Sequence, residues 1–369
     1  MPGFKCQYYP VQAGEMAFDL DETNAAAYLS SRGLVDPDSV EKVELLGWGV
    51  SNVLVKVQTR GDCMVIKQSL ARLRVTEDWF ADRERIYREC ACIETLSTIL
   101  PTGALPEVRY QDQDNYLFVM SCAPEEGVNW KEQLLAGQVD ETVAGKVGAA
   151  LGAIHRETTG SSTVRERFLN DQVFIQLRIE PYHWTTAKVH PDLAQVIQRE
   201  AARMLEVKTA LVHGDFSPKN IIVTGQDVFL LDFEVVHYGN PVFDLAFMLN
   251  HLMLKSVHNA GIRNMYFHAA RSFWQGYQEQ AGLDLRTAAQ RERDTIKQTG
   301  CLMLARIDGK SPAEYIVDPA VKESVRSIAR DILLGDYAKL DDMMALVDGK
   351  LSRSPVSQSP VSGEAPVQG

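Results

Sequence analysis

The octet HGDFSPKN, residues 213–220, places a histidine, a glycine, an aspartate and an asparagine in one turn-forming stretch. It lies between two short apolar runs, ALV and IIV, as expected of a polar loop that joins two strands. A further aspartate, Asp232, stands at the end of the next apolar run, FLL. Because two strand–loop units follow one another, we expect the side chains of Asp215, Asn220 and Asp232 to converge.

This set of side chains suits phosphoryl transfer. A carboxylate such as Asp215 can orient and deprotonate an attacking hydroxyl, while Asn220 and Asp232 can hold Mg²⁺ on the phosphates. Aspartate and asparagine are also common turn formers, so none of them is diagnostic alone. Their combination with Gly214 between two apolar runs favours the catalytic interpretation. Glu234 is assigned either to a second Mg²⁺ or to a solvated surface position.

An upstream loop, GWGVSN, lies between two strand-like segments and can present free backbone N–H groups to phosphates. The residues assigned to nucleotide binding in this loop are Gly47, Gly49, Ser51 and Asn52. Lys67 ends the strand that follows, as expected of a lysine that holds the α- and β-phosphates. Glu89, in the next helical pattern, is assigned as its ion-pair partner, with Glu84 on the same helix as the alternative.

Strand-like patterns dominate the first part of the chain and helical patterns the second. Apolar and polar residues alternate between 43 and 67, and the tetrapeptide TRGD indicates a hairpin turn. Beyond Ala123 the pattern is mainly helical. The other predicted segments are helices at 16–33, 76–98, 140–158, 240–308 and 320–348 and a strand at 116–122.

These patterns predict an α+β protein in three stretches. They are an N-terminal nucleotide-binding lobe at 1–122, a C-terminal catalytic and acceptor-binding lobe at 123–350, and a tail at 351–369. The tail is rich in Pro and Ser and has no aromatic residue, so we expect it to be disordered. Residues 1–15 show no clear period, and whether they belong to the fold is left open.

The composition of the chain excludes some classes of binding partner. The chain has 369 residues, 45% of them hydrophobic, and a net charge of −11 without a basic cluster. This balance argues against nucleic acid as a partner. No stretch approaches the length of an apolar membrane span, and no basic segment precedes an apolar run at the N-terminus. We therefore predict a cytoplasmic protein without a membrane partner.

The cysteines are scattered. Six are present, and the only close pair, Cys90 and Cys92, lies in a helical pattern, where residues two apart do not face each other. No metal-ligand spacing occurs among them. Reduced thiols are the prediction for all of them.

The motifs HGDFSPKN, LDFE and YGNPVFDLAF resemble those of the aminoglycoside phosphotransferase and choline kinase superfamily, over roughly residues 40–310. The resemblance implies a bilobal protein-kinase-like fold with a small antiparallel-sheet N-lobe and a larger, mainly helical C-lobe. It also implies that His213 packs beneath the catalytic loop and that Asp244 braces this loop. At the lobe junction, Met120 and Ala123 are assigned to the adenine.

Within the superfamily the N-lobe stretch VIKQSLARLRVTEDWFADRERIYRE is most similar to methylthioribose kinases. A second similarity lies at LMLARIDGKSPAEY, where twin arginines bind the sugar in those enzymes. Arg306 occupies one of the two positions and is assigned to the acceptor, while Ala305 occupies the other. The chain also departs from methylthioribose kinases at Phe233, where they place proline, and in keeping Asn220.

The predicted function is ATP- and Mg²⁺-dependent phosphorylation of a hydroxyl on a small molecule, such as a sugar or a similar metabolite. One alternative is an aminoglycoside-modifying kinase, for which LDDMMALVD at 340–348 is the only acidic cluster available. The other is a nucleotide-binding pseudoenzyme or interaction module, against which the complete set of base and metal residues argues. The oligomeric state is left open, with a homodimer as one option.

Overall fold

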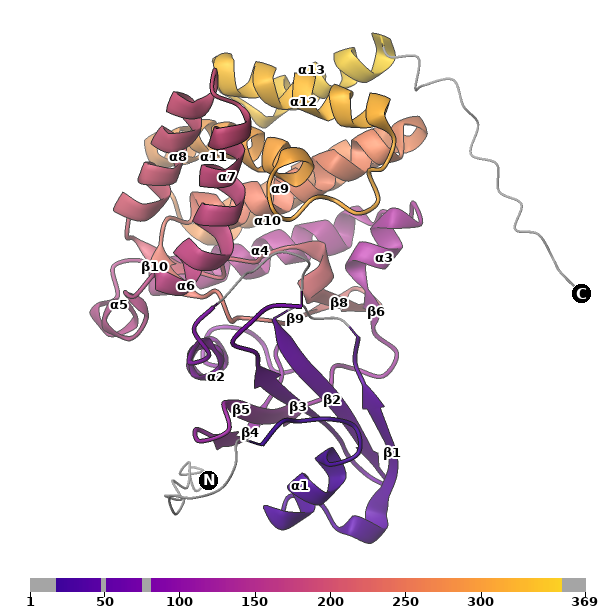
Figure 1. The fold of residues 1–369 in the computed structure, drawn as a ribbon. Coiled ribbons are helices and arrows are strands. Elements are labelled where there is room, and N and C mark those ends of the chain that lie inside the picture. Colours follow the sequence, from indigo (N-terminus) through magenta and orange to yellow (C-terminus); the bar gives the residue numbers. More distant parts are fainter. Residues whose placement is uncertain (1–17, 48–50, 75–80, 354–369) are drawn as a thin grey trace, which may run out of the picture.

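The computed structural model describes residues 18–47, 51–74 and 81–353 (Figure 1). Gly49, residues 1–15 and the predicted tail from residue 354 onward lie outside the described residues. In the described part an antiparallel sheet comes first in the chain and helices dominate the remainder, as the sequence predicts. No helix within these ranges is both long enough and apolar enough to span a bilayer.

The first sheet has five strands in the order β1-β2-β3-β5-β4. Their bounds are β1 Val40–Leu45, β2 Asn52–Thr59, β3 Cys63–Ser69, β4 Val108–Asp112 and β5 Leu117–Ser121. The hairpin between β2 and β3 lies at the predicted TRGD turn, with Gln58 opposite Cys63. Strand β4 was not predicted, because its sequence, VRYQD, has only one aliphatic residue.

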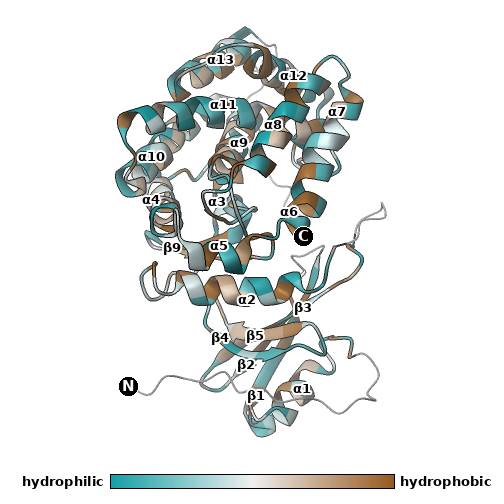
Figure 2. Ribbon diagram, turned by 90° about the vertical axis from the view of Figure 1, so that its left-hand side faces the viewer, coloured by the Kyte–Doolittle hydropathy of each residue, from teal (hydrophilic) through white to brown (hydrophobic). Residues whose placement is uncertain are grey.

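Both faces of the central strand β3 are covered, and this explains its almost continuous burial. On one face Met64 and Ile66 pack with helix α1, Ala25–Ser31, in a core that includes Leu29. On the other face Val65 packs with helix α2, Arg85–Leu96. Figure 2 shows α2 lying between the sheet and the helical part of the molecule. The strand that carries Lys67 is therefore held rigidly.

Two helices are shorter than predicted. Helix α1 begins only at Ala25, because the Asp21 carboxylate accepts hydrogen bonds from the backbone N–H groups of Thr23 and Asn24 and forms a turn first. It ends before Gly33, whose φ of +69° suits a left-handed helix stop. Helix α2 begins at Arg85 rather than near 76; residues 75–80 lie outside the described part.

The helical part is built around helix α9, which is buried along nearly its whole length and is flanked by α10 and α11 (Figure 1). An apolar surface on all sides is typical of such a central helix. The helices are α3 Trp130–Leu135, α4 Glu141–Thr158, α5 Ser162–Phe168, α6 Gln172–Phe174, α7 Thr185–Val189, α8 Ala194–Glu206, α9 Val242–His258, α10 Arg263–Ala281, α11 Leu285–Asp308, α12 Pro319–Leu334 and α13 Leu340–Arg353, with a π-helix at Ile175–Trp184 and short 3₁₀ turns at Pro37–Ser39, Pro218–Asn220 and Ala260–Ile262.

Two small sheets surround the HGDFSPKN loop. Strand β7, Ala210–Val212, enters the loop and pairs with β10, His237–Gly239. Strand β8, Ile221–Thr224, leaves the loop and pairs with β6, Val128–Asn129, and with β9, Asp227–Leu230. The two apolar runs around the octet are thus strands of different sheets.

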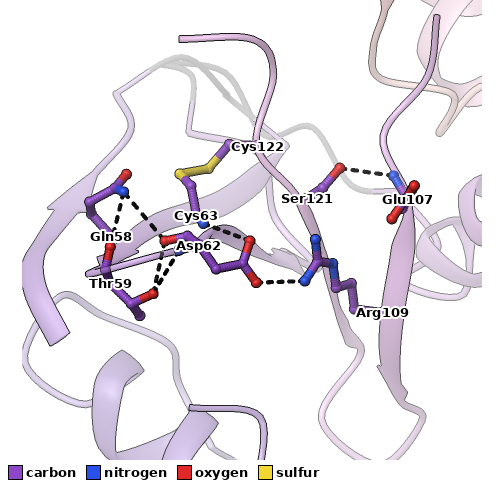
Figure 3. The surroundings of a disulfide bond; sticks show 8 residues. All are labelled: Gln58, Thr59, Asp62, Cys63, Glu107, Arg109, Ser121 and Cys122. Carbon is purple, nitrogen blue, oxygen red and sulfur yellow. Dashed lines mark hydrogen bonds and ion pairs between the residues drawn. A yellow bond between two sulfur atoms is a disulfide. The ribbon is translucent and has the colours of Figure 1, made fainter. Parts of the chain in front are cut away.

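The prediction of reduced thiols is wrong for one pair: Cys63 and Cys122 form a disulfide, with a Cα–Cα distance of 5.4 Å (Figure 3). The two residues are 59 positions apart in the sequence, so their spacing carries no signal. The antiparallel register of β3 and β5 places Met64 opposite Ser121 and therefore brings their neighbours together. Cys90, Cys92 and Cys301 are free and buried, and Cys6 lies outside the described residues.

We expect reduction of this disulfide to lower the free energy of unfolding by about 2–4 kcal/mol, because the crosslink restricts the unfolded chain. Urea titration with and without a phosphine reductant measures the difference. The Cys63→Ser variant is the control, since its stability should not respond to the reductant. Equal stability of the wild type in both conditions would contradict the expectation.

Candidate active site

Asp244 of α9 holds the HGDFSPKN loop through hydrogen bonds to its backbone. The Asp244 carboxylate accepts hydrogen bonds from the backbone N–H groups of His213, at 2.7 Å, and Gly214, at 2.9 Å. The His213 ring donates from Nε2 to the Leu231 carbonyl at 3.1 Å, and its Nδ1 accepts from the Asp215 N–H at 3.2 Å. These are the supporting contacts that the family resemblance implies for His213 and Asp244.

We expect Asp244→Ala to destabilise the protein, because it leaves two buried N–H groups without an acceptor. Each such group costs about 1–3 kcal/mol. Asp244→Asn keeps one side-chain acceptor oxygen and should lose less stability. Thermal and urea denaturation of the two variants test this order, and an alanine variant as stable as the wild type would contradict it.

Asp215 is buried, with 3% of its surface exposed, and three groups from two elements hold its carboxylate. The Asn220 amide donates to Oδ2 at 2.9 Å, Lys219 Nζ lies 2.9 Å from the same oxygen, and Arg178 lies 2.9 Å from Oδ1. Burial alone would raise the pKa of Asp215, but Arg178 and Lys219 outweigh it and hold the pKa below its ordinary value. Asp215 is therefore ionised at neutral pH.

Arg178 was missed by the sequence analysis. It lies in the π-helix Ile175–Trp184, donates from Nε to the Gly214 carbonyl at 2.7 Å, and stands over the rings of Tyr182 and Phe247 at 5.9 and 5.6 Å. Pro181 in the same segment argues against a helix when the sequence is read alone. Lys219, in contrast, lies inside the octet and was visible as a cation next to Asn220.

Lys67 connects the first sheet with the catalytic region. Its Nζ lies 2.8 and 2.6 Å from the two carboxylate oxygens of Glu89 and 2.7 Å from Oδ1 of Asp232. Burial alone would lower the pKa of Lys67, but Asp232 and Glu89 raise it well above its ordinary value. Of the two candidate partners, Glu89 is the one that pairs with Lys67, whereas Glu84 is exposed at the start of α2.

Glu234 is buried, with 5% of its surface exposed, so the solvated alternative is wrong. It accepts hydrogen bonds from Ser51 Oγ at 2.7 Å, Asn52 Nδ2 at 2.9 Å and Arg85 Nε at 2.9 Å. The side chains of Ser51 and Asn52 thus bind Glu234 and tie the start of β2 to the helical part. Arg85 was not predicted, since its partner lies 149 residues away.

Asp232 lies at the junction of these groups and has a positive φ of 66°. Its side chain is partly exposed, at 24%. The backbone N–H of the preceding residue, Leu231, donates to the Asn220 carbonyl at 2.9 Å, so Asp232 lies next to the HGDFSPKN loop. Burial and Asp215 raise the pKa of Asp232, while Lys67 and Lys219 keep it below its ordinary value. The Asp215 and Asn220 side chains are in direct contact, and Asp232 directly follows the residue whose N–H binds Asn220. The assignment of the three side chains to base and metal stays a prediction. Within the described ranges no cluster of three or more His, Cys, Asp or Glu side chains has a metal-binding arrangement.

The remaining predicted residues lie at β1, at β5 and on α11. Met120 is in β5, where it pairs with Val65 and Val108, and Ala123 follows the end of that strand. Gly47 follows β1, and a Cβ added there would meet no other described residue within 4 Å. Arg306 of α11 donates to the carbonyl and the hydroxyl of Ser311 and is 8% exposed.

The chain is similar to curated proteins at low sequence identity. The chain is 24% identical to methylthioribose kinase 2 of Oryza sativa subsp. japonica over 271 residues, which cover 64% of this chain and 62% of the relative. It is also 24% identical to a methylthioribose kinase of Escherichia coli, covering 58% of this chain and 57% of that protein. The chain thus spans about three fifths of the length of these curated relatives.

Two solved structures have the same overall fold. A choline/ethanolamine kinase family protein from Mesorhizobium loti is 16% identical, with a TM-score of 0.51 over 89% of this chain and 99% of that chain. An amicoumacin kinase in complex with AMP-PNP and Ca²⁺ is 15% identical, with a TM-score of 0.51 over 84% of this chain and 93% of that chain. The predicted protein-kinase-like α+β fold is confirmed.

A family model described as "phosphotransferase enzyme family" matches residues 42–283. This range contains Lys67, Glu89, the HGDFSPKN loop and Asp232. Since the match covers more than half of the sequence, the chain belongs to the phosphotransferase enzyme family.

Proposed function

We propose that the protein is an ATP- and Mg²⁺-dependent kinase that phosphorylates a hydroxyl group of a small molecule. The observation that carries the proposal is the ionised Asp215, held by Arg178 and Lys219 beside Asn220. An ionised carboxylate in this position can accept a hydrogen bond from an acceptor hydroxyl and orient its oxygen towards the transferred phosphoryl group.

The nucleotide side of the proposal rests on Lys67. Its triple contact with Glu89 and Asp232 fixes the ammonium group where the α- and β-phosphates would bind. Gly47 and its neighbours would offer backbone N–H groups to the same phosphates, and Met120 and Ala123 would offer backbone groups to the adenine. These roles accord with a nucleotide-binding lobe at 1–122 and a catalytic lobe at 123–350.

Asn220 and Asp232 fit Mg²⁺ by their chemistry. Because the Asn220 amide nitrogen already donates to Asp215, its carbonyl oxygen is the atom left to face a metal. The Asp232 carboxylate is partly exposed and supplies a second oxygen, which suits a hard cation. Bound Mg²⁺ would neutralise charge on the phosphates. Glu234 is committed to three donors and is the weaker candidate ligand.

A pseudoenzyme is the second candidate function, but a module that only bound nucleotide would not need the Arg178–Asp215–Lys219 arrangement. A cytoplasmic location and a homodimer remain proposals, to be tested by fractionation and by light scattering.

The test is a screen of hydroxylated metabolites for ADP release, with sugars, sugar acids and amino alcohols in the panel. Release must depend on both the acceptor and Mg²⁺, and mass spectrometry must find the phosphorylated acceptor. The absence of acceptor-dependent release across the panel, from protein that binds ATP, would favour the pseudoenzyme.

A further inference from the structure

A second group of polar side chains lies where α3, α9 and α11 meet the segment that joins α11 to α12 (Figure 1). Three of them are cations, Lys131 of α3, Lys255 of α9 and Arg306 of α11, which we call the cationic cluster. Lys131 and Arg306 both contact Glu314, with Arg306 at 3.8 Å. Lys255 Nζ lies 5.2 Å from the ring centroid of the adjacent Tyr315.

Two polar groups here are buried without a hydrogen-bond partner. Lys255 is 0% exposed. Among the described residues, neither Lys255 Nζ nor the Tyr315 hydroxyl has a hydrogen-bond partner. Burying such groups unpaired costs free energy, most of all for an ammonium group. A residue that destabilises the fold in this way calls for a functional reason, and a bound ligand supplies one.

The local charge is not balanced. The principal charged neighbours of Lys255 are Lys131, Arg306 and Glu314, so three cations face one carboxylate. The Glu314 side chain is 60% exposed and points partly to solvent. Burial, together with Lys131 and Arg306, lowers the pKa of Lys255 to about 7, against the opposite effect of Glu314. An anion beside Lys255 would reverse this and restore its positive charge.

The cluster is connected to the catalytic loop through packed side chains. Arg178, which pairs with Asp215, lies against Phe247, and the Phe247 ring is 5.3 Å from that of His251. His251 precedes Lys255 by one helical turn on α9. Its pKa is well below the ordinary value, first through burial and then through Lys255, Arg306, Lys219 and Lys131. Cations of the cluster and Lys219 of the HGDFSPKN loop thus both lower the pKa of His251.

We infer that the cationic cluster binds an anionic group of the phosphate acceptor, a carboxylate or a phosphate, and that Lys255 is its central ligand. The acceptor is then a hydroxyl compound that carries a negative charge. Tyr315 would supply a neutral hydrogen bond to the same group. This inference rests on the proposed kinase function. It also disfavours polycationic aminoglycosides, which like charges at this position would repel.

The experiment compares acceptors that share a hydroxyl scaffold and differ in charge: glycerol with glycerate and glycerol 3-phosphate, and glucose with gluconate and glucose 6-phosphate. We expect an anionic member of a pair to be the better substrate, and the carboxylate and phosphate arms show which anion is bound. Lys255→Met should raise the Michaelis constant of that acceptor roughly 10–100-fold, the loss expected for a hydrogen bond to a charged group. The Michaelis constant of ATP should stay unchanged, and the melting temperature should rise.

Lys297→Met is the matched control. Lys297 donates to the carbonyls of Leu333, at 2.8 Å, and Gly335, at 2.7 Å, at the end of α12. Its loss should lower the melting temperature and leave the acceptor's Michaelis constant unchanged. A purely structural role for Lys255 would give the same pattern as Lys297, and the inference would be wrong.

Different results of these experiments would contradict the anion site and the proposed kinase function. Efficient turnover of neutral or cationic acceptors, unaffected by Lys255→Met, would overturn the inference and leave the kinase in place. If no acceptor is phosphorylated, the proposed function fails, and calorimetric titration of the Mg·ADP-saturated protein with inorganic phosphate still decides the site. Phosphate binding lost in Lys255→Met and kept in Lys297→Met supports the cluster as an anion site, and equal binding in both refutes it.

Discussion

Asp215→Asn is expected to lower the rate of phosphoryl transfer by about 10²–10⁴-fold, the contribution of a positioned proton acceptor. The amide has nearly the same shape as the carboxylate and keeps an oxygen for Arg178 or Lys219. It does not carry the charge that draws the acceptor hydroxyl and its proton. Lys67, Glu89 and Asp232 are untouched, so binding of Mg·ATP should survive.

The measurement is single-turnover transfer from labelled ATP, together with a nucleotide titration. Asp227→Asn is the matched control, since Asp227 lies at the start of β9, in the neighbouring hairpin, with a side chain that is 91% exposed. Its activity should equal that of the wild type. Near-normal transfer by the Asp215 variant would show that the base lies elsewhere, whereas lost nucleotide binding would point to a collapsed loop.

Asp232→Ala should weaken the binding of Mg·ATP roughly 10–100-fold, as expected when a group that binds charged partners is lost. Two effects add. The proposed site loses a hard oxygen ligand for the metal. In addition, Lys67 loses the 2.7 Å contact that holds its ammonium group between Glu89 and the catalytic region.

The backbone of Asp232 requires a second variant. Its φ of 66° lies in the left-handed region, which asparagine tolerates better than alanine does. Asp232→Asn therefore removes the charge and keeps the local conformation. If both variants lose Mg·ATP affinity in calorimetry, the carboxylate is responsible. If only the alanine variant is impaired, the charge of Asp232 is not required, and the loss lies with the backbone or with the side-chain oxygen that asparagine retains. If neither variant is impaired, the metal assignment fails.

The parts of the site that the sequence predicts are those encoded locally. The octet and its two flanking strands, and the lysine at the end of β3, are recognisable because apolar runs adjoin polar residues within a few positions. Asp215 and Asn220 lie close together because they share one loop, and the β8–β9 hairpin brings Asp232 back next to that loop. The order of sheet followed by helices follows from the change of hydrophobic period near Ala123.

What the sequence does not reveal depends on long-range packing. Arg178 reaches Asp215 only because a proline-containing segment folds as a π-helix, and Arg85 reaches Glu234 across 149 residues. The choice of Glu89 over Glu84 depends on which face of α2 packs on the sheet. The Cys63–Cys122 pair depends on strand register. Neither the hydrophobic period nor the composition of the sequence indicates these contacts.

The disulfide also bears on how the two parts of the molecule can move. Cys122 is the residue at which the chain leaves the first sheet, and Cys63 begins the strand that carries Lys67. The crosslink makes this exit point part of the same rigid body as Lys67. Gly127, the next fixed point, packs so closely on Ile222 that a side chain there would lie 2.3 Å from it. Any movement of the first sheet relative to the helical part must therefore pivot on the four peptide units between Ala123 and Gly127, which include a stiff proline at position 124.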